Sequence, residues 1–322
     1  MTSVSAAFDS AVAPDVVRTG VHVVTVTHNS ASTIEAYFAG IEACAADIAG
    51  VTIVDNASTD DTLDRVRAAL QGASVPVEVI ENENSGFAGG YYAASCSSVQ
   101  RGLPVLCLNP DVALAEGAVD AMLDVLDSFP DAAVVTVPLV GIDGSPDTAS
   151  RRRLPTLGAS MLYSVLGRLT PSRLRYNRRE ADAAPMLSTR AGRPVNVLQA
   201  TTGALMLVAA DFRTLDEGVF DRDYWMYGED LQLCADAAAS GRRVLIVEVA
   251  PSVHVKGVSS GRPRSHRSNR AFHDAMYRYA QKNLVRHPVM LHGLRLGVEA
   301  HFVLTEAKAF PVRLRSRAAA RV

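Results

Sequence analysis

A carboxylate follows a buried strand in residues 105–111, which read Val-Leu-Cys-Leu-Asn-Pro-Asp. The continuous apolar run is typical of a strand covered on both faces, and Pro110 prevents the strand from passing directly into a helix. Ligands of open α/β sheets bind outside the carboxyl ends of the strands. This placement makes Asp111 a candidate metal ligand. The alternative is that Asn109, Pro110 and Asp111 form only a turn.

Three earlier strand-like runs also end in polar residues, at 27–30, 55–61 and 84–90. The carboxyl ends of neighbouring parallel strands converge on one crevice, so the clusters together indicate a ligand site. Glycines in 84–90 would let backbone N–H groups approach phosphates closely, although a plain turn would also use them. The sequence has no Gly-x-Gly-x-x-Gly after its first strand and no Gly-Lys-Ser/Thr loop. It therefore does not read as a dinucleotide dehydrogenase or a P-loop NTPase.

Two adjacent carboxylates, Glu229 and Asp230, open a predicted helix after an aromatic segment. They could supply a general base, or simply place favourable charge at the positive end of the helix dipole. Trp225, the only tryptophan, could line a binding site or pack in the core. His254 follows a later strand, where a lone histidine is usually structural.

A scaffold of alternating strands and helices must position these residues. The alternation predicts an α/β fold with a Rossmann-like, mostly parallel central sheet, helices on both faces and additional C-terminal helices. Strands are expected at 21–27, 51–54, 77–80, 105–108, 133–137, 195–198, 203–208 and 244–247. Helices are expected in the later part of the chain near 157–168 and at 230–239, 268–286 and 289–308, the last of them ending before Pro311.

Composition excludes some classes of protein. A net charge of −2 over 322 residues gives no nucleic-acid signature. Ten arginines between Arg151 and Arg193, and a basic region after Pro251, indicate contact with something anionic, such as a diphosphate or a membrane surface. The four cysteines lack metal-site spacing, and no apolar run reaches the about 18 residues of a spanning helix. We therefore expect a reduced, cytoplasmic chain that could lie peripherally on the inner face of the plasma membrane.

Five motifs, in this order along the chain, resemble those of glycosyltransferase family 2, the inverting enzymes of GT-A fold. They are VTHNS at 26–30, VDNASTD at 54–60, NSGFAGG at 84–90, LNPD at 108–111 and WMYGED at 225–230. Within the family the chain is most similar to the bacterial rhamnosyltransferase-like branch. The motifs together are specific for the family but only weakly specific for the sugar transferred.

This resemblance implies roles at the matching positions. Asp55 would accept a hydrogen bond from the pyrimidine base of the donor, Asp230 would be the catalytic base, and Glu229 would bind the acceptor or tune Asp230. Trp225 and Gly203 would lie at the sugar or acceptor site. The nucleotide-sugar would be bound by Thr27, Asn29, Asp55, Ser58, Asn84, Gly86, Phe87, Asn109 and Asp111.

The resemblance also implies a divalent cation, Mg²⁺ or Mn²⁺. The Asp-x-Asp motif of the family reads Asn109-Pro110-Asp111 here, which leaves Asp111 as its only charged ligand. His254 would be a second ligand, with diphosphate oxygens and water completing the shell. The cation would neutralise charge on the departing nucleoside diphosphate. A basic stretch would form a lid over the diphosphate, or else a solvated loop: Arg262, Arg264, His266, Arg267 and Arg270.

The expected organisation has three parts. Residues 1–18 form a loose lead-in, 19–260 a GT-A catalytic domain, and 261–322 a basic lid with a C-terminal helical segment. The catalytic domain divides into a nucleotide-binding half at 19–138, an inserted or mobile segment at 139–194 and an acceptor half at 195–260.

The implied function is inverting, metal-dependent transfer of L-rhamnose from dTDP-rhamnose. The acceptor would be polyprenyl-diphosphate-linked or a growing glycan in cell-envelope (cell wall) polysaccharide synthesis. Transfer of galactofuranose or a hexose from a UDP-sugar is the alternative within the class. A sugar nucleotidyltransferase would need a Gly-rich loop bearing Arg or Lys after the first strand, which residues 28–31 lack. A non-enzymatic scaffold would bind no nucleotide. The sequence does not indicate an oligomeric state.

Overall fold

The computed structural model describes residues 20–97, 102–156, 187–214, 216–255 and 264–319, with side chains as far as residue 311. The lead-in expected at 1–18, the helix expected near 157–168, and Arg262 lie outside the described residues.

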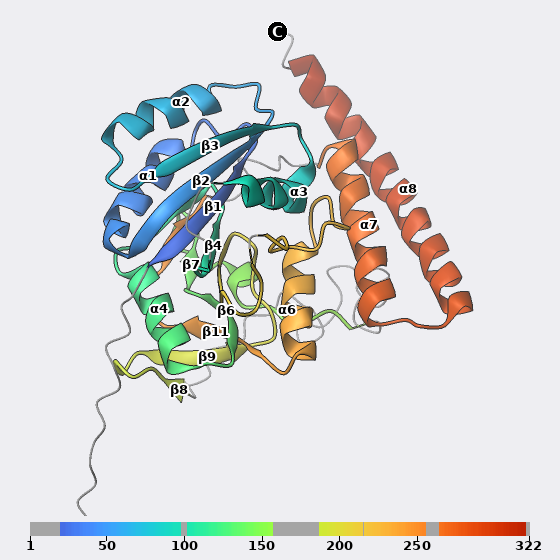
Figure 1. Cartoon of the computed structure of the whole chain (residues 1–322). Helices are drawn as coiled ribbons and strands as arrows, with labels where there is room; N and C mark the ends of the chain where they lie inside the picture. The colour runs from blue at the N-terminus through green and yellow to red at the C-terminus, as the bar shows by residue number, and fades with distance from the viewer. Residues whose placement is uncertain (1–19, 98–101, 157–186, 215, 256–263, 320–322) are drawn as a thin grey trace, which may run out of the picture.

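A nine-stranded sheet forms the centre of the molecule, in the order β3-β2-β1-β4-β10-β6-β11-β9-β8 (Figure 1). Its strands are β1 (Val21–Thr27), β2 (Ile48–Asn56), β3 (Val77–Asn82), β4 (Val105–Leu108), β6 (Ala132–Thr136), β8 (Leu187–Ser188), β9 (Pro194–Leu198), β10 (Leu205–Val208) and β11 (Arg243–Val247). Strands from both predicted halves of the catalytic domain therefore share one sheet.

The first four strands run parallel, because β1 pairs in parallel with β2 and β4, and β2 with β3. Their carboxyl ends lie along one edge, which confirms the predicted parallel arrangement of this part. β10 runs antiparallel between β4 and β6, with Leu205 opposite Leu108. Gly203 and Ala204, which precede β10, consequently lie at the same edge as Asn109.

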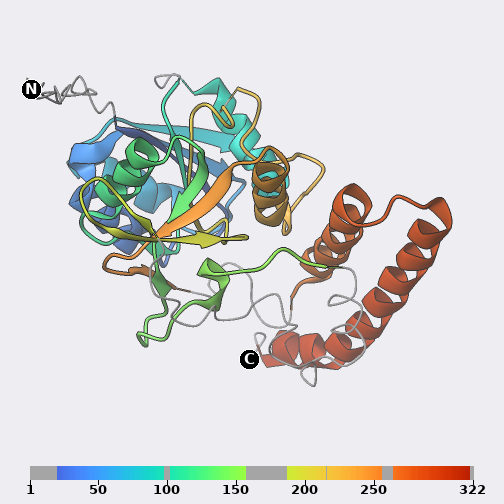
Figure 2. The ribbon, with the colours of Figure 1, turned by 90° about the horizontal axis from the view of Figure 1, so that it is seen from below.

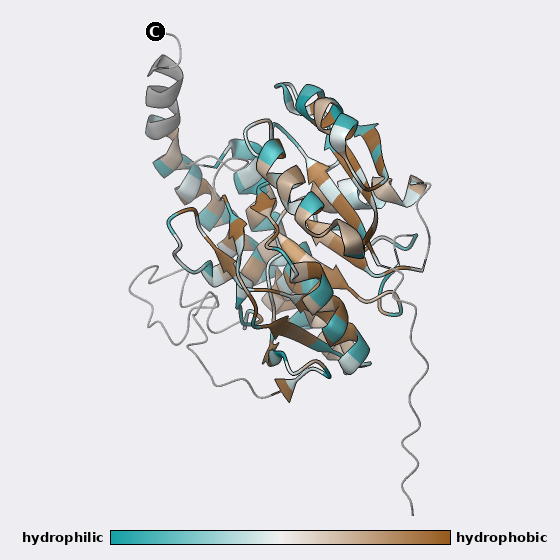
Figure 3. Cartoon of the chain, turned by 90° about the vertical axis from the view of Figure 1, so that its left-hand side faces the viewer, coloured by the Kyte–Doolittle hydropathy of each residue, from teal (hydrophilic) through white to brown (hydrophobic). Residues whose placement is uncertain are grey.

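Helices cover both faces of the sheet, and alternate strand residues face different layers. Val23 belongs to the apolar cluster under α1 (Ile34–Ala43), α2 (Thr62–Ala69) and α4 (Ala118–Ser128). Val24 belongs to the cluster under α3 (Gly86–Ala93) and α6 (Glu229–Ala239). Figure 3 shows the strands as mostly hydrophobic and the helices as mixed, as expected for a sheet buried on both faces.

A small second sheet joins distant parts of the chain. It consists of β5 (Val112–Ala113), β12 (Ser252–His254) and β7 (Leu139–Val140), in the order β5-β12-β7. His254 lies opposite Val112 in the antiparallel pair, and β12 runs parallel to β7. Asp147 N donates to Leu139 O (2.8 Å), which holds the short helix η4 (Thr148–Ser150) beside this sheet.

Two C-terminal helices, α7 (His266–Asn283) and α8 (Pro288–Ala319), form an antiparallel hairpin, with α7 next to the main body and α8 outside it (Figures 1 and 2). The expected end of the last helix before Pro311 is wrong, since α8 continues through this proline. Proline removes one backbone donor and clashes with the preceding turn, which weakens a helix without always ending it. Within the described residues, no helix is both long and apolar enough to cross a membrane.

Candidate active site

A network centred on Asp55 joins the ends of β1 and β2. The Asp55 carboxylate is buried and accepts from Thr27 Oγ1 (2.8 Å), Ser58 Oγ (2.5 Å) and Ser58 N (2.9 Å). Asn29 N donates to Ser58 Oγ (2.9 Å), and Asn29 has a φ of 53°, a left-handed conformation that asparagine tolerates. Because a carboxylate offers about four acceptor positions, Asp55 can accept one further N–H bond, such as that of a pyrimidine base.

The loop after β3 is locked to the segment that contains Trp225. Asn84 Oδ1 accepts from Gly86 N (3.3 Å), and Phe87 N donates to Trp225 O (2.7 Å). Gly86 has a φ of +84°, and a Cβ added there would lie 2.1 Å from Trp225 O. Only glycine fits this position without movement of the Trp225 segment. A Cβ on Gly203 would lie 3.6 Å from the Phe87 ring, so all five of these predicted site residues lie close together.

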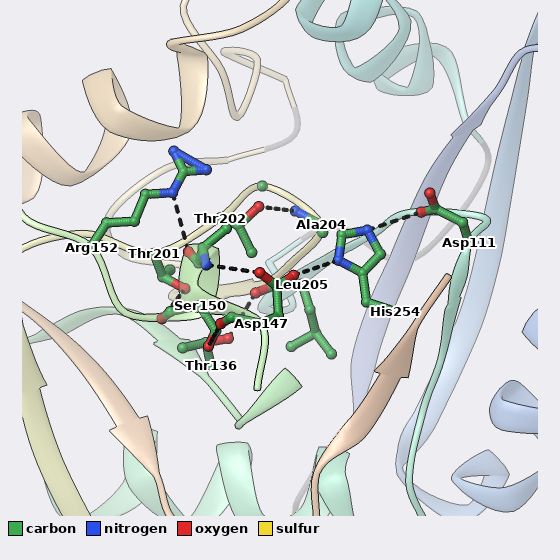
Figure 4. Close-up of polar contacts among 12 residues, drawn as sticks. Asp111, Thr136, Asp147, Ser150, Arg152, Thr201, Thr202, Ala204, Leu205 and His254 are labelled. Atoms are coloured by element: carbon green, nitrogen blue, oxygen red, sulfur yellow. Dashed lines mark hydrogen bonds and ion pairs between the residues drawn. The ribbon is translucent and has the colours of Figure 1, made fainter. Parts of the chain in front are cut away.

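His254 links Asp111 to Asp147, as Figure 4 shows. Its Nε2 lies 3.5 Å from Asp111 Oδ1, and its Nδ1 lies 2.8 Å from Asp147 Oδ2. All three side chains are buried. The small sheet sets this geometry, because Val255 N also donates to Asp111 O (2.8 Å).

Two side-chain oxygens of the Asn109-Pro110-Asp111 loop accept no hydrogen bond from the described part of the chain. Asn109 Oδ1 and Asp111 Oδ1 are buried and accept no hydrogen bond among the described residues, although His254 Nε2 lies 3.5 Å from Asp111 Oδ1. Buried oxygens that accept no hydrogen bond are energetically costly, and they suit a hard cation that prefers oxygen ligands. No cluster of three or more His, Cys, Asp or Glu side chains within the described ranges is arranged to hold a metal ion. A cation here would therefore need ligands from the donor diphosphate as well.

His254 carries a proton readily in the absence of a cation. Although burial alone lowers the pKa of His254, contacts with Asp111 and Asp147 raise it to about 9. A cation and a proton would compete for Nε2, because only the neutral imidazole ligates metals.

The two carboxylates at the start of α6 are buried, unlike the solvated charges of an ordinary helix start. Asp230 Oδ2 accepts from Arg152 Nη2 (2.9 Å) and Gly203 N (3.1 Å), and its Oδ1 accepts from Leu231 N (2.8 Å). Glu229 Oε2 has no hydrogen-bond partner among the described residues. Burial and the adjacent Asp230 raise the pKa of Glu229 to about 8, so a protonated Glu229 lies beside Asp230 near neutral pH.

Residues 203 and 204 connect the two halves of the site. Gly203 N donates to Asp230, and the next carbonyl, Ala204 O, accepts from Asn109 N (2.9 Å). The candidate base and the candidate metal loop are thus bound to consecutive residues. This adjacency requires β10 to lie beside β4, a pairing that follows from the sheet order.

Sequence reasoning did not find Asp147 or assign a role to Arg152. Asp147 precedes a small-residue turn and accepts from Ala149 N (2.8 Å), a local pattern that indicates a helix cap and not a partner for His254. Arg152 belonged to the predicted basic cluster, but the pattern gave no reason to separate it from its neighbours Arg151 and Arg153. The site contacts of both residues bridge long sequence separations.

The basic residues at the start of α7 have partners inside the protein. Arg267 lies over the Trp225 ring (4.1 Å from guanidinium carbon to centroid) and donates to Asn84 O (3.2 Å). Arg270 pairs with Asp274 and Glu299 (both 2.6 Å). A cavity of about 350 Å³ is lined by the Trp225 segment on one side and by α7 on the other. Its walls include Trp225, Arg267 and Arg270 but neither Asp111 nor Asp230.

The fold and the site define an enzyme of the GT-A type, in which polar loops at the carboxyl ends of parallel strands meet a buried carboxylate pair. A family model described as "Glycosyl transferase family 2" matches residues 22–187, more than half of the chain. The chain belongs to glycosyltransferase family 2 and is a glycosyltransferase. The match ends before Asp230 and His254.

One curated relative is N-acetylglucosaminyl-diphospho-decaprenol L-rhamnosyltransferase of Mycobacterium tuberculosis, 28% identical over 274 residues, covering 79% of this chain and 82% of the relative. Two solved structures share the fold. S. aureus TarS 1-349 in complex with UDP is 15% identical, with 91% of this chain and 75% of that chain covered and a TM-score of 0.50. GalNAc-T7 with UDP, GalNAc and Mn²⁺ is 14% identical, with 91% and 57% covered and a TM-score of 0.51.

Proposed function

We propose that this glycosyltransferase moves L-rhamnose from dTDP-rhamnose to a polyprenyl-diphosphate-linked acceptor on the cytoplasmic side of a membrane. The support for rhamnose and for a lipid-linked acceptor is the similarity to the mycobacterial enzyme, whose name contains both. We also propose that residues 19–260 form the catalytic unit and that the C-terminal helices complete the acceptor side.

The donor would lie along the edge formed by β1, β2, β3 and β4. Asp55 would bind the base, and the 84–90 loop with its glycine at residue 86 would cover the nucleoside. UDP occupies the TarS structure, and UDP with Mn²⁺ the GalNAc-T7 structure. In this chain Asp111 and His254 would hold Mg²⁺ or Mn²⁺ together with the donor diphosphate. The cation, when bound, supplies charge neutralisation for the leaving group.

Asp230 would act as the base. In an inverting reaction the acceptor hydroxyl oxygen attacks the anomeric carbon while its proton passes to the carboxylate. The bond from the anomeric carbon to the diphosphate oxygen breaks, and the diphosphate leaves with the electron pair. Arg152 and Gly203 hold Asp230 Oδ2 in place, and Glu229 lies next to it as a buried acid.

One observation carries this proposal. Asp230 and Asn109 bind consecutive residues, Gly203 and Ala204, so the base lies beside the loop that would meet the diphosphate. We assign the cavity between Trp225 and α7 to part of the acceptor, because the Trp225 segment that lines it is bonded to Phe87 of the proposed donor loop. The raised pKa of the buried Glu229 carboxyl fits a group that stays protonated beside the proposed base.

A donor panel tests the proposal. Purified full-length protein is incubated with dTDP-rhamnose, UDP-galactofuranose, UDP-glucose or GDP-mannose, with Mn²⁺ or Mg²⁺, and a polyprenyl-diphosphate-linked N-acetylglucosamine acceptor. Transfer from dTDP-rhamnose alone is expected. Transfer from a UDP-sugar would assign the alternative donor, and transfer with the metal removed by chelation would reject the metal role.

A further inference from the structure

The face of α8 that points away from α7 is apolar. Large side chains recur there at intervals of seven residues, and two more follow directly after members of this series. We call this the outer stripe: Val289, Met290, Leu296, Val303, Leu304 and Phe310, each between 53% and 72% exposed. The small residues Gly293, Gly297, Ala300 and Ala307 lie between them in the helical repeat. A stripe of this width normally faces a core or another apolar surface.

The inner face of α8 packs on α7 through both apolar and polar contacts: Val298 is buried, and the Phe302 ring packs on His273 (5.4 Å between centroids). Glu299 pairs with Arg270 (2.6 Å), and Glu306 accepts from Asn269 Nδ2 (2.7 Å). His301 Nδ1 lies 2.9 Å from His273 Nε2. Both glutamates of α8 are thus used on the side that faces α7, and large apolar side chains remain on the side that faces outward. Figure 2 shows α8 on the outside of the hairpin, with α7 between it and the main body.

The charges at both ends of α8 indicate what covers the outer stripe. The sequence from Ala307 to Val322 contains five basic residues and no acidic residue, and the stretch from Arg286 to Val298 contains two arginines, two histidines and no acidic residue. The two glutamates of α8 are both bound to α7. A second copy packed on the stripe, parallel or antiparallel, would bring basic ends against basic ends. An anionic surface would complement both ends.

We propose that α8 lies on an anionic lipid bilayer, with the outer stripe among the acyl chains and the basic ends at the head groups. This inference rests on the proposed function to the extent that a lipid-linked acceptor would be held in the same bilayer. Arg267 of α7 stacks on Trp225, so the helix that carries α8 also contacts the site. The hairpin would place the cavity between Trp225 and α7 close to the membrane surface.

Vesicle flotation with the full-length protein tests this surface. Vesicles of phosphatidylcholine alone are compared with vesicles that also contain phosphatidylglycerol. Binding is expected only to the anionic vesicles. The double variant Leu296→Gln/Val303→Gln should weaken binding to the vesicles at least about tenfold. Burial of each of these side chains among the acyl chains is by itself expected to strengthen binding about tenfold. Ile142→Gln is the control. Ile142 is also a large exposed apolar residue (77% exposed), but it follows β7 and does not belong to α8.

Three outcomes would overturn the proposal: no binding of the wild type, binding that the double variant retains, or an equal loss with Ile142→Gln. Sedimentation of the same proteins without lipid tests whether a second copy of the chain covers the outer stripe instead. A dimer that the double variant dissociates would assign the outer stripe to a second copy of the chain. Calorimetry of dTDP binding in solution tests the proposed function separately. The substitutions at Leu296 and Val303 should leave the dTDP affinity unchanged.

Discussion

Arg152 Nη2 lies 2.9 Å from Asp230 Oδ2, and the side chains of the two residues are only 14% and 9% exposed. This ion pair connects the segment after η4 to the first turn of α6. It fixes the orientation of the carboxylate that we propose as the base. Removal of one partner of such a buried pair leaves an uncompensated charge, and this has a measurable consequence for stability.

Arg152→Ala should lower the free energy of unfolding by about 3–5 kcal/mol, because the buried Asp230 carboxylate then loses its cationic partner and keeps only two backbone N–H donors from the described residues. The same substitution in an Asp230→Asn background should cost much less. Urea denaturation of the four proteins in this cycle measures the coupling between the two side chains. Equal costs in both backgrounds would show that the ion pair does not stabilise the fold.

Asp230→Asn should reduce the rate of transfer about 10²- to 10⁴-fold, since the amide cannot take the acceptor proton. Nucleotide binding, measured by calorimetry, should stay unchanged. Asp236→Asn is the control, because Asp236 is a carboxylate on the same helix that pairs with Arg213 (2.9 Å). Full transfer activity in Asp230→Asn would remove Asp230 from the role of base.

Stability should depend on pH through Glu229. Its carboxyl pKa rises from the ordinary 4.5 to about 8 in the folded protein, first through burial and then through Asp230. The folded state therefore binds the proton more tightly than the unfolded state, and this stabilisation is complete below about pH 4.5 and lost as pH rises through about 8. Glu229→Gln, neutral at every pH, should gain stability relative to the wild type by up to about 1.4 kcal/mol per pH unit across this window. Denaturant midpoints of both proteins over that range test the slope, and parallel curves would contradict it.

Asp147→Asn should weaken Mn²⁺ binding about 10- to 100-fold, because the charged oxygen that orients His254 is lost. The variant can still accept from Ala149 N, so the cap of η4 is kept. Calorimetric titration of Mn²⁺ in the presence of dTDP gives the affinity without reference to activity. Asp143→Asn, a change at a nearby loop carboxylate that bonds Ser145 (2.6 Å), should leave the affinity unchanged. The same loss in both variants would exclude a specific role for Asp147.

Gly86→Ala should destabilise the protein more than Gly117→Ala. Both glycines have positive φ, at +84° and +73°, and both alanines meet the left-handed penalty of about 1–2 kcal/mol. Only at Gly86 does the new Cβ also meet Trp225 O, whereas nothing lies within 4 Å at Gly117. Thermal unfolding of the two variants compares the costs, and dTDP affinity should fall in Gly86→Ala alone. Equal costs would mean that the Trp225 segment moves away freely.

The sequence alone determined the parallel half of the fold and the residues available for chemistry. Apolar β-branched runs such as Val21–Thr27 form buried strands in almost any context, and their order along the chain places the polar ends at one edge. The positions of Asp55, Asp111 and Asp230 follow from that local pattern and from the family motifs. Local patterns also indicated the C-terminal helices, although not the passage of α8 through Pro311.

The tertiary structure decided which of these groups meet. Arg152 reaches Asp230 across 78 residues and His254 reaches Asp147 across 107, and no spacing rule connects such distant positions. Both contacts depend on strand pairing: β10 lies beside β4, and β12 lies between β5 and β7. Burial of Glu229 and the outward apolar face of α8 also appear only after packing. Side-chain partners and protonation depend on what surrounds a residue in space, and a linear sequence specifies that only through the complete fold.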